Sequence, residues 1–416
     1  MESASRRRTF RLFLPVLFVA LFIWMTAPVV WSQDWPQWRG PDRDGAGSFD
    51  APATWPDSLE QQWKVDVGLG YGTPLVVGAR IYTFSRQDDD EVMTALDAGT
   101  GETLWRTAYP ASFEMFAPTA PHGAGPKSTP TYADGRLFSF GMTSVLTAFD
   151  AETGRQLWQT PVPSQQPMYH TAQSPVVDGN EVIVHAGGPG DTSLSAYDVA
   201  TGEVRWSWGG DSPAYGSPIV ADLGGRRQVI LFTHSMMVGI ARDNGELLWS
   251  RPFVTPSNTT AQTPIIYDDM VIQAGRENGL TAFRVIPQGG EWRTEDVWHT
   301  DEASLHMTNG VAVNGVLYGL SHLNSGQYFA VDLEDGSLVW ISPGRQAENA
   351  GIVRSGNTIF SIQDDAQMVV LDATRDSFDP VARYEVATSE TWAQPAVSGN
   401  RLFVKDVSTL TLWTLD

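Results

Sequence analysis

The sequence predicts an all-β chain folded as an eight-bladed β-propeller of four-stranded antiparallel blades, and three observations predict this fold. One short element recurs at a spacing of about 45 residues, as propeller blades do. Glycine and proline are abundant, at 39 and 26 residues, which suits many short strands joined by tight turns. The two ends of the repeated region also carry complementary parts of one unit.

Residues 1–32 precede the repeats and have the form of an export segment. Leu12 to Gln33 are uncharged, and arginines stand before them; these are Arg6, Arg7, Arg8 and Arg11. The segment is either a cleaved signal peptide or an uncleaved signal anchor. In both cases the remaining chain is exported to the periplasm or cell envelope.

Residues 33–57 form a strap rich in tryptophan, proline and glycine. It contains Trp35, Trp38 and Trp55, and such a density of aromatic rings is unusual in a free linker. We therefore expect the strap to be ordered and to dock on the propeller. Within it, Asp42-Arg43-Asp44-Gly45 is interpreted as a turn.

The repeated element of each blade is a strand, an aspartate-led turn and a strand that carries tryptophan. The clear copies are ALDAGTGETLW (95–105), AFDAETGRQLW (148–158), AYDVATGEVRW (196–206), GIARDNGELLW (239–249) and AVDLEDGSLVW (330–340). Two copies are degenerate, at 282–298 and 371–384. Aspartate can bond the backbone of the turn, glycine takes a left-handed conformation, and tryptophan fills the space between blades. We interpret the repeated tryptophans as structural.

Each copy follows a hairpin, and each hairpin follows a short segment that we call a starter. Turn pairs such as Asp134-Gly135 and Asn314-Gly315 favour two-residue hairpin turns. The starters are GTP (72–74), STP (128–130), QSP (173–175), GSP (216–218), QTP (262–264), TNG (308–310), NAG (349–351) and AQP (393–395). Eight starters predict eight blades.

The eighth unit ends at Asp416 without its tryptophan strand. The missing strand is at the other end of the propeller region, in LEQQWKVDVG, residues 59–68. Pairing of this N-terminal strand with the C-terminal strand, at about 408–416, closes the ring and removes two sheet edges. The predicted propeller therefore spans residues 58–416.

Charge and cysteine content exclude several classes of function. A net charge of −21 argues against nucleic acid and anionic lipid surfaces as partners. The absence of cysteine excludes disulfides and thiol chemistry. We expect a monomer that meets the membrane only through an uncleaved N-terminal segment.

The repeat A-x-D-x-x-T-G-x-x-x-W resembles that of the pyrroloquinoline quinone (PQQ) propeller superfamily, over residues 59–416. DWPQWRGPDRDG (34–45) also resembles a segment near the start of many bacterial PQQ-like propellers. The superfamily contains quinoprotein dehydrogenases and non-catalytic members similar to BamB. The resemblance implies PQQ with calcium for an enzyme, but the cysteine pair of those enzymes is missing here, and their calcium ligands find no matching positions. We therefore expect no cofactor and no metal site.

Polar residues near the starters predict where a site could lie. Starters and the turns between second and third strands share one face of a propeller, and the other turns share the opposite face. We expect a ligand funnel on the first face, built from His122, His170, Tyr215, His306, Glu348, Asn349 and Trp392. His185, His234 and His322 lie at or near the turns of the same face. A solvated loop position is the alternative interpretation for each histidine.

No local motif assigns catalytic residues. The acidic run from Asp88 to Glu91 is interpreted as a solvated turn. The sequence therefore predicts a non-catalytic binding or assembly scaffold of the cell envelope, whose partner is an envelope protein or a small ligand on the loop-rich face. One alternative is a PQQ-dependent alcohol or sugar oxidoreductase. A second alternative is a carbohydrate-binding or carbohydrate-cleaving propeller.

Overall fold

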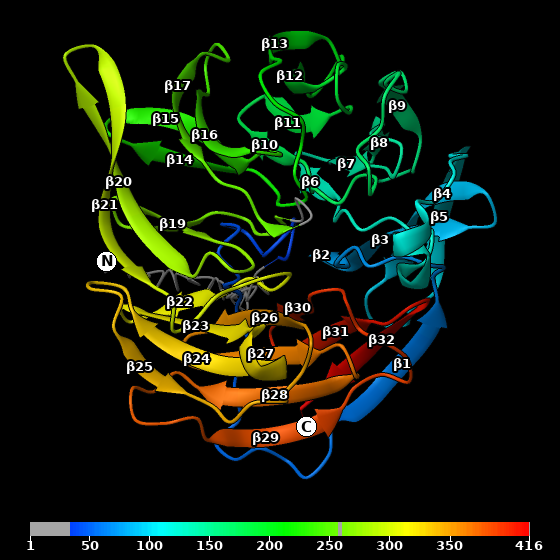
Figure 1. Ribbon diagram of the computed structural model, residues 1–416. Coiled ribbons are helices and arrows are strands. Elements are labelled where there is room, and N and C mark those ends of the chain that lie inside the picture. Colours follow the sequence, from blue (N-terminus) through cyan, green and yellow to red (C-terminus); the bar gives the residue numbers. More distant parts are fainter. Residues whose placement is uncertain (1–33, 257–259, 416) are drawn as a thin grey trace, which may run out of the picture. The chain divides into compact units, whose positions relative to one another are not determined.

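The computed structural model describes residues 34–256 and 260–415. In this part of the chain, eight four-stranded antiparallel sheets stand around a common centre, which confirms the predicted propeller (Figure 1). The interpretation of residues 1–32 falls outside the described residues. Among the residues described, no helix is both long and apolar enough to cross a bilayer.

Within each of the first four blades, the four strands follow one another outward from the ring centre in chain order. Blade 1 contains β2 (Leu75–Val77), β3 (Arg80–Gln87), β4 (Asp90–Asp97) and β5 (Thr103–Pro110). Blade 2 contains β6 (Thr131–Ala133), β7 (Arg136–Phe140), β8 (Leu146–Asp150) and β9 (Gln156–Gln159). Blade 3 contains β10 (Val176–Asp178), β11 (Glu181–Ala186), β12 (Ser193–Asp198) and β13 (Val204–Trp208). Blade 4 contains β14 (Ile219–Leu223), β15 (Arg226–Phe232), β16 (Met236–Ala241) and β17 (Leu247–Pro252).

The next three blades repeat this order, and the last blade uses both ends of the ring. Blade 5 contains β18 (Ile265–Tyr267), β19 (Met270–Ala274), β20 (Leu280–Gln288) and β21 (Glu291–Thr300). Blade 6 contains β22 (Val311–Val313), β23 (Val316–Ser321), β24 (Gln327–Asp332) and β25 (Leu338–Ile341). Blade 7 contains β26 (Ala350–Ser355), β27 (Thr358–Gln363), β28 (Gln367–Asp372) and β29 (Pro380–Glu385). Blade 8 contains β30 (Ala396–Ser398), β31 (Arg401–Lys405), β32 (Thr409–Thr414) and β1 (Glu60–Asp66). Between the described strands lie the short 3₁₀ helices η1 (Ala117–His122) and η3 (Leu323–Ser325).

The ring closes as the sequence predicts. Strand β1 pairs antiparallel with β32, and the register places Val65 opposite Leu410. Lys405 strengthens this seam because its buried Nζ, with three N–H donors, lies within hydrogen-bond distance of four backbone carbonyls, including Gly70 O at 2.6 Å. Burial lowers the pKa of this ammonium to about 8.

The blades are held to one another by the tryptophans of the repeat. Trp158 Nε1 donates to Val199 O of the next blade at 3.2 Å, and its ring lies against Gly202, where a Cβ would come within 2.7 Å of it. The same bond to the following blade joins Trp63 to Ala98, Trp105 to Ala151, Trp206 to Arg242, Trp298 to Leu333 and Trp340 to Thr374. Their structural interpretation is confirmed.

Blade 5 departs from this pattern. Its degenerate repeat forms the long hairpin β20–β21, which extends beyond the other blades (Figure 1). Trp249 of blade 4 meets no aspartate-led turn there and donates instead to Gln228 Oε1 at 2.7 Å. Trp292 of the hairpin packs beside Gly224 of blade 4. The hairpin thus replaces the usual junction between these blades.

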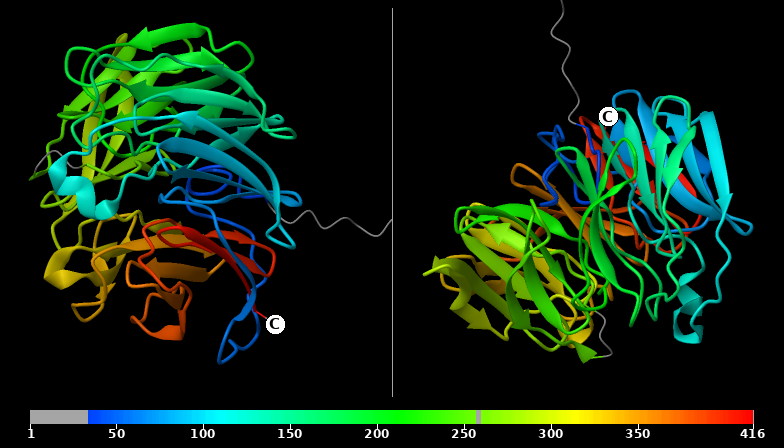
Figure 2. Two further views of the ribbon diagram at one scale, coloured as in Figure 1. Left: turned by 90° about the vertical axis from the view of Figure 1, so that its right-hand side faces the viewer. Right: turned by 90° about the horizontal axis from the view of Figure 1, so that it is seen from above.

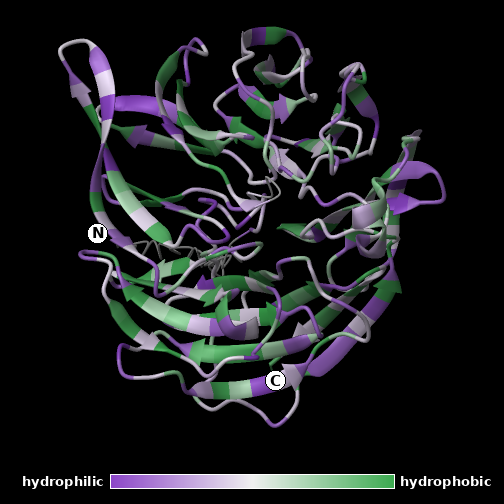
Figure 3. Ribbon diagram, in the orientation of Figure 1, coloured by the Kyte–Doolittle hydropathy of each residue, from purple (hydrophilic) through white to green (hydrophobic). Residues whose placement is uncertain are grey.

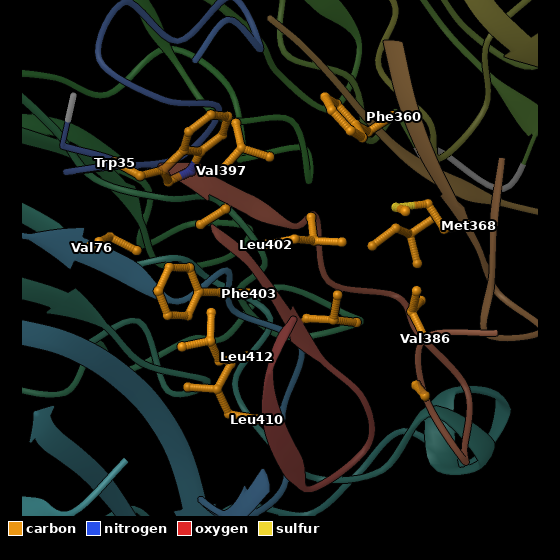
Figure 4. Close-up of a cluster of buried hydrophobic side chains, with 14 of the residues drawn as sticks. Trp35, Val76, Phe360, Met368, Val386, Val397, Leu402, Phe403, Leu410 and Leu412 are labelled. Carbon is orange, nitrogen blue, oxygen red and sulfur yellow. The ribbon is translucent and has the colours of Figure 1, made fainter. Parts of the chain in front are cut away.

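Apolar side chains of the middle strands form the core between blades. Figure 3 shows apolar residues along the strands and polar residues in most turns. One core cluster joins blades 7, 8 and 1 to the strap and contains Trp35, Phe403 and Phe360. Figure 4 shows Trp35 of this cluster beside Val397. The strap is therefore part of the hydrophobic core.

Candidate functional site

The propeller has two different faces. Starters and the turns between second and third strands lie on one face, which we call the starter face. The strap enters from the opposite face, which we call the strap face: Gly78 N of a first hairpin turn donates to Asp34 Oδ1, and Gly399 N of another donates to Ser48 O. In Figure 2 (left), η1 and the strap lie toward opposite sides of the ring.

The starters form a hydrogen-bonded inner ring, a role that the sequence interpretation missed. In four of the starters the backbone N–H of the middle residue donates to the side-chain oxygen of the corresponding residue in the next blade. These bonds measure 2.9 Å and join Thr73 to Thr129, Thr129 to Ser174, Ser174 to Ser217, and Thr263 to Asn309. The signal in the sequence was that most starters have Ser, Thr or Asn as their middle residue, each with a side-chain oxygen that can accept such a bond.

The strap fills the ring centre between these starters. Trp35 exchanges two backbone hydrogen bonds with Val76 of blade 1, and Asp50 N donates to Gly399 O of blade 8. Gly47 N donates to Arg354 O of blade 7 at 2.8 Å. Trp38 Nε1 donates to Thr263 Oγ1 of blade 5, also at 2.8 Å. The predicted docking of the strap tryptophans is thus observed, and the strap ties distant blades together.

Two buried arginines of the strap bind backbone carbonyls of the starters. Arg39 Nη2 donates to Gly310 O at 2.7 Å, and Arg43 donates to Pro175 O at 3.0 Å and to Ser174 O at 3.3 Å. Their exposed fractions are 2% and 3%. Burial lowers the pKa of Arg39 to about 10 and that of Arg43 to about 9. The segment that contains Arg43 is a turn, as the sequence predicts, but the Arg43 side chain is buried, because each guanidinium finds carbonyl acceptors from the blades.

The predicted funnel residues fall into separate pairs. His122 at the end of η1 meets Trp392 edge to face, with ring centroids 4.9 Å apart. Trp392 Nε1 donates to Glu390 Oε2 at 3.1 Å. Connections from blades 1 and 7 therefore meet here on the starter face, beside the closing seam.

His170 and Tyr215 belong to a second group. Tyr169 N donates to Tyr215 Oη at 3.2 Å, and His170 Nε2 lies 3.0 Å from Glu114 O. His170 is buried and adopts a left-handed φ of 61°. Burial lowers its pKa, so the ring is neutral at pH 7. It serves here to hold the connection 111–127 against the connection 160–170.

The remaining funnel residues lie in two other places. His306 faces His322, with ring centroids 5.8 Å apart, and burial lowers the pKa of His306 to about 4. Asn349 N donates to Asp364 Oδ1 at 3.1 Å, while Glu348 beside it is exposed. These groups line the starter face at different blades.

The acidic run contains a residue that the sequence interpretation misplaced. Glu91 is fully buried between blades 1 and 2, where it accepts hydrogen bonds from Tyr109 Oη at 2.8 Å and from Met142 N at 2.6 Å. Burial raises its pKa above the usual range. Only its neighbours lie in a polar turn, where Asp89 pairs with Arg86 at 3.2 Å.

The residues present do not fit PQQ with calcium. The chain contains no cysteine for the ring contact that the resemblance implies. Within residues 34–256 and 260–415, no three His, Asp or Glu side chains gather as a metal site would require. The ring centre holds Trp38, Arg39 and Arg43, each bonded to the blades.

Exposed apolar side chains gather on the connections of the starter face. Phe116 packs edge to face on Tyr169 at 5.3 Å, and Tyr169 contacts Tyr215 at 5.4 Å. Phe116 is 38% exposed and Met168 is 64% exposed. We call Phe116, Met168, Tyr169 and Tyr215 the aromatic ledge. Such a patch on a soluble surface is typical of a binding site.

Known proteins share both the repeat and the ring. The family model described as outer membrane protein assembly factor BamB matches residues 88–342, more than half of the chain. BamB of Shewanella oneidensis is 24% identical over 379 residues, which covers 83% of this chain and 86% of that protein.

Solved structures match the fold. The crystal structure of BamB from Moraxella catarrhalis matches with a TM-score of 0.61 and 16% identity over 86% of this chain and 97% of that one. Quinohemoprotein alcohol dehydrogenase from Comamonas testosteroni matches with a TM-score of 0.68 and 15% identity over 92% of this chain and 80% of that one. At these identities the structures compare the fold alone. With the family match over more than half of its length, the chain belongs to the BamB family of PQQ-like β-propellers.

Proposed function

We propose that this protein is a non-catalytic scaffold of the cell envelope that binds a protein of outer-membrane assembly through its starter face. The observation that carries the proposal is the aromatic ledge, where Phe116 and Met168 are exposed beside the rings of Tyr169 and Tyr215. Exposed aromatic and methionine side chains are enriched where proteins bind one another.

Three further features support this function. The family to which the chain belongs is described as that of the outer membrane protein assembly factor BamB. The export segment predicted at residues 1–32 would bring the chain to the envelope. The ring centre is occupied by the strap, so the starter-face connections are left as the surface for a partner. The funnel residues predicted from the sequence would then act as parts of this surface.

Site-specific photo-crosslinking in the source cell tests the proposal. A photoreactive phenylalanine at position 116 or 168 should crosslink one and the same outer-membrane assembly protein. Position 204 is the matched control, because Val204 is 56% exposed on the outer strand β13, away from the ledge. Absence of a crosslink at 116 and 168, or an equal crosslink at 204, would contradict the proposal.

A second measurement separates the scaffold from an oxidoreductase. The purified chain is mixed with PQQ, calcium and alcohols or sugars, and reduction of an artificial dye is followed. We expect no turnover above that of the same mixture without protein. Substrate-dependent dye reduction would overturn the non-catalytic assignment.

A further inference from the structure

A cavity on the starter face lies where three distant parts of the chain meet. Its volume is about 400 Å³, and it is lined by residues 69–71, 121–123, 125 and 389–390, with Val407 from blade 8. These segments belong to the lead into blade 1, the end of η1 and the connection between blades 7 and 8. The cavity is therefore built across the seam that closes the ring.

Hydrogen bonds hold the floor of this cavity. Lys405 Nζ donates to Gly70 O at 2.6 Å and to Val407 O at 3.4 Å, and Tyr71 N donates to Pro126 O at 2.8 Å. The Lys405 ammonium is buried under the floor, and Asp406 and Asp66 are the acidic groups that act on it. Residues 70 and 71 of the floor are thus bonded to blade 8 and to the connection that follows η1.

The walls combine aromatic rings with one negative charge. Among the described residues that line the cavity, Glu390 carries the single carboxylate, and Tyr71 and His122 carry the rings. Trp392 supports this wall because it donates to Glu390 and packs against His122. Aromatic faces beside a carboxylate are the surroundings that favour a cationic side chain, arginine above all.

The electrostatics agree with this chemistry. Burial and then the Glu390 carboxylate raise the pKa of Tyr71. Burial lowers the pKa of His122, with a smaller contribution from Lys127, while Glu390 acts in the opposite direction. His122 is therefore neutral at pH 7 and does not repel a cation. Two cations lie outside the lining. Lys127 is near His122, and burial lowers its pKa. Lys405 lies beneath the floor, where Asp406 and Asp66 offset its charge.

We propose that this cavity binds an arginine side chain of the protein partner, between the Glu390 carboxylate and the rings of Tyr71 and His122. The inference rests on the proposed function and names the chemistry of its partner. The net charge of −21 favours a basic partner surface. Leu69, 41% exposed at the rim, offers apolar contact to the residues that flank such an arginine.

Titration with N-acetyl-arginine amide tests the inference, and N-acetyl-citrulline amide is the uncharged control of the same shape. The readout is the Trp392 indole N–H signal in ¹⁵N–¹H spectra of the mature chain, assigned with Trp392→Phe. We expect a saturable shift with the arginine probe, at least tenfold weaker binding of the citrulline probe, and at least tenfold weaker arginine binding in Glu390→Gln. Glu334→Gln, which changes an exposed glutamate on the strap face, should bind arginine as the unaltered chain does.

The outcomes separate this inference from the proposed function. Equal binding of both probes, or unchanged arginine binding in Glu390→Gln, would overturn the arginine site even if position 116 still crosslinks its partner. Saturable binding of a neutral sugar such as N-acetylglucosamine that displaces the arginine probe would also overturn it. Selective arginine binding without a crosslink at positions 116 and 168 would count against the scaffold function and leave the site in place.

Discussion

The ring centre and the starter-face ledge differ in how far they bury their large side chains. Trp35, Arg39 and Arg43 of the strap are at most 3% exposed and bond to blades on several sides. Phe116 and Met168 of the ledge are 38% and 64% exposed. We infer that this propeller separates stability from recognition by position, since the side chains of the centre are buried and those of the ledge retain surface for a partner.

The strap can fill the centre because it binds backbone groups. Arg39 and Arg43 donate to carbonyls of Gly310, Ser174 and Pro175, atoms that every starter provides whatever its side chain. Guanidinium groups suit this role, since each presents several donors in fixed directions. The centre therefore tolerates blades of different sequence, whereas the ledge depends on its particular side chains.

The largest expected effect is at the centre, in Trp35→Ala. Trp35 is fully buried in the cluster that joins blades 7, 8 and 1. Truncation of such a side chain costs about 3–5 kcal/mol of unfolding free energy, because it removes apolar contacts and leaves a cavity. Urea unfolding followed by circular dichroism measures the loss. Phe116→Ala on the ledge is the control, and a loss in Trp35→Ala no larger than in this control would contradict the comparison.

The next effect is expected for Arg43→Met. The change relieves the desolvation of a buried charge but leaves Ser174 O without the donor that Arg43 supplies, and it removes the bond to Gln37 Oε1. We expect a loss of about 2–3 kcal/mol, the range for hydrogen bonds to charged groups. Arg293→Met changes an arginine that is exposed and paired only with Glu295, and should leave the unfolding midpoint unchanged. Equal midpoints for both variants would show that the strap arginines do not stabilise the ring.

A fall in pH should change the stability contributed by a buried histidine near the starter face but not the charge of the strap arginines. His185, at the second hairpin of blade 3 on the starter face, is 1% exposed, and burial lowers its pKa from 6.5 to about 4. The unfolded chain thus binds this proton more readily, so His185 contributes stability at pH 7 that is lost as pH falls from 6.5 toward 4. The strap arginines, with pKa values of about 9 and 10, keep their charge throughout this range.

His185→Gln should therefore reduce the acid sensitivity of the fold. Between pH 7 and pH 4.5 we expect the unaltered chain to lose about 2 kcal/mol more unfolding free energy than the variant. His299→Gln, at a half-exposed histidine on β21, is the matched control and should follow the unaltered chain. Parallel pH profiles for His185→Gln and the unaltered chain would show that His185 does not contribute.

The ring could be predicted from the sequence because its rules are local and repeated. Asp97 Oδ1 accepts from the N–H groups of Gly99 and Thr100 within one turn, and the tryptophan strand follows at a fixed spacing. The closing pair of β1 and β32 could be predicted because each end lacked what the other supplied. Such features need no knowledge of distances across the ring.

The buried charges could not be predicted in the same way. Arg43 lies in a hydrophilic motif, DRDG, and Glu91 ends an acidic run, so composition indicates solvent for both. Their burial depends on carbonyls and hydroxyls brought by other blades, such as Pro175 O and Tyr109 Oη. The funnel residues illustrate the same limit. Topology indicates their face, but the contacts that pair His122 with Trp392 and His306 with His322 depend on where each blade stands around the ring.

The smallest effect on stability is expected on the ledge, in the double variant Phe116→Ser with Met168→Ser. Phe116 is 38% exposed and Met168 is 64% exposed, so the unfolding free energy should change by less than about 1 kcal/mol, as for most surface substitutions. Binding of the assembly partner should nevertheless fall at least tenfold, because exposed aromatic and methionine anchors contribute mainly on association. Crosslinking from an unchanged ledge position, residue 215, together with urea unfolding, measures both quantities on one sample. Val204→Ser should preserve both, since Val204 is exposed on β13 away from the ledge. A double variant that unfolds readily, or that keeps its crosslink, would show that recognition and stability are not divided between the ledge and the centre.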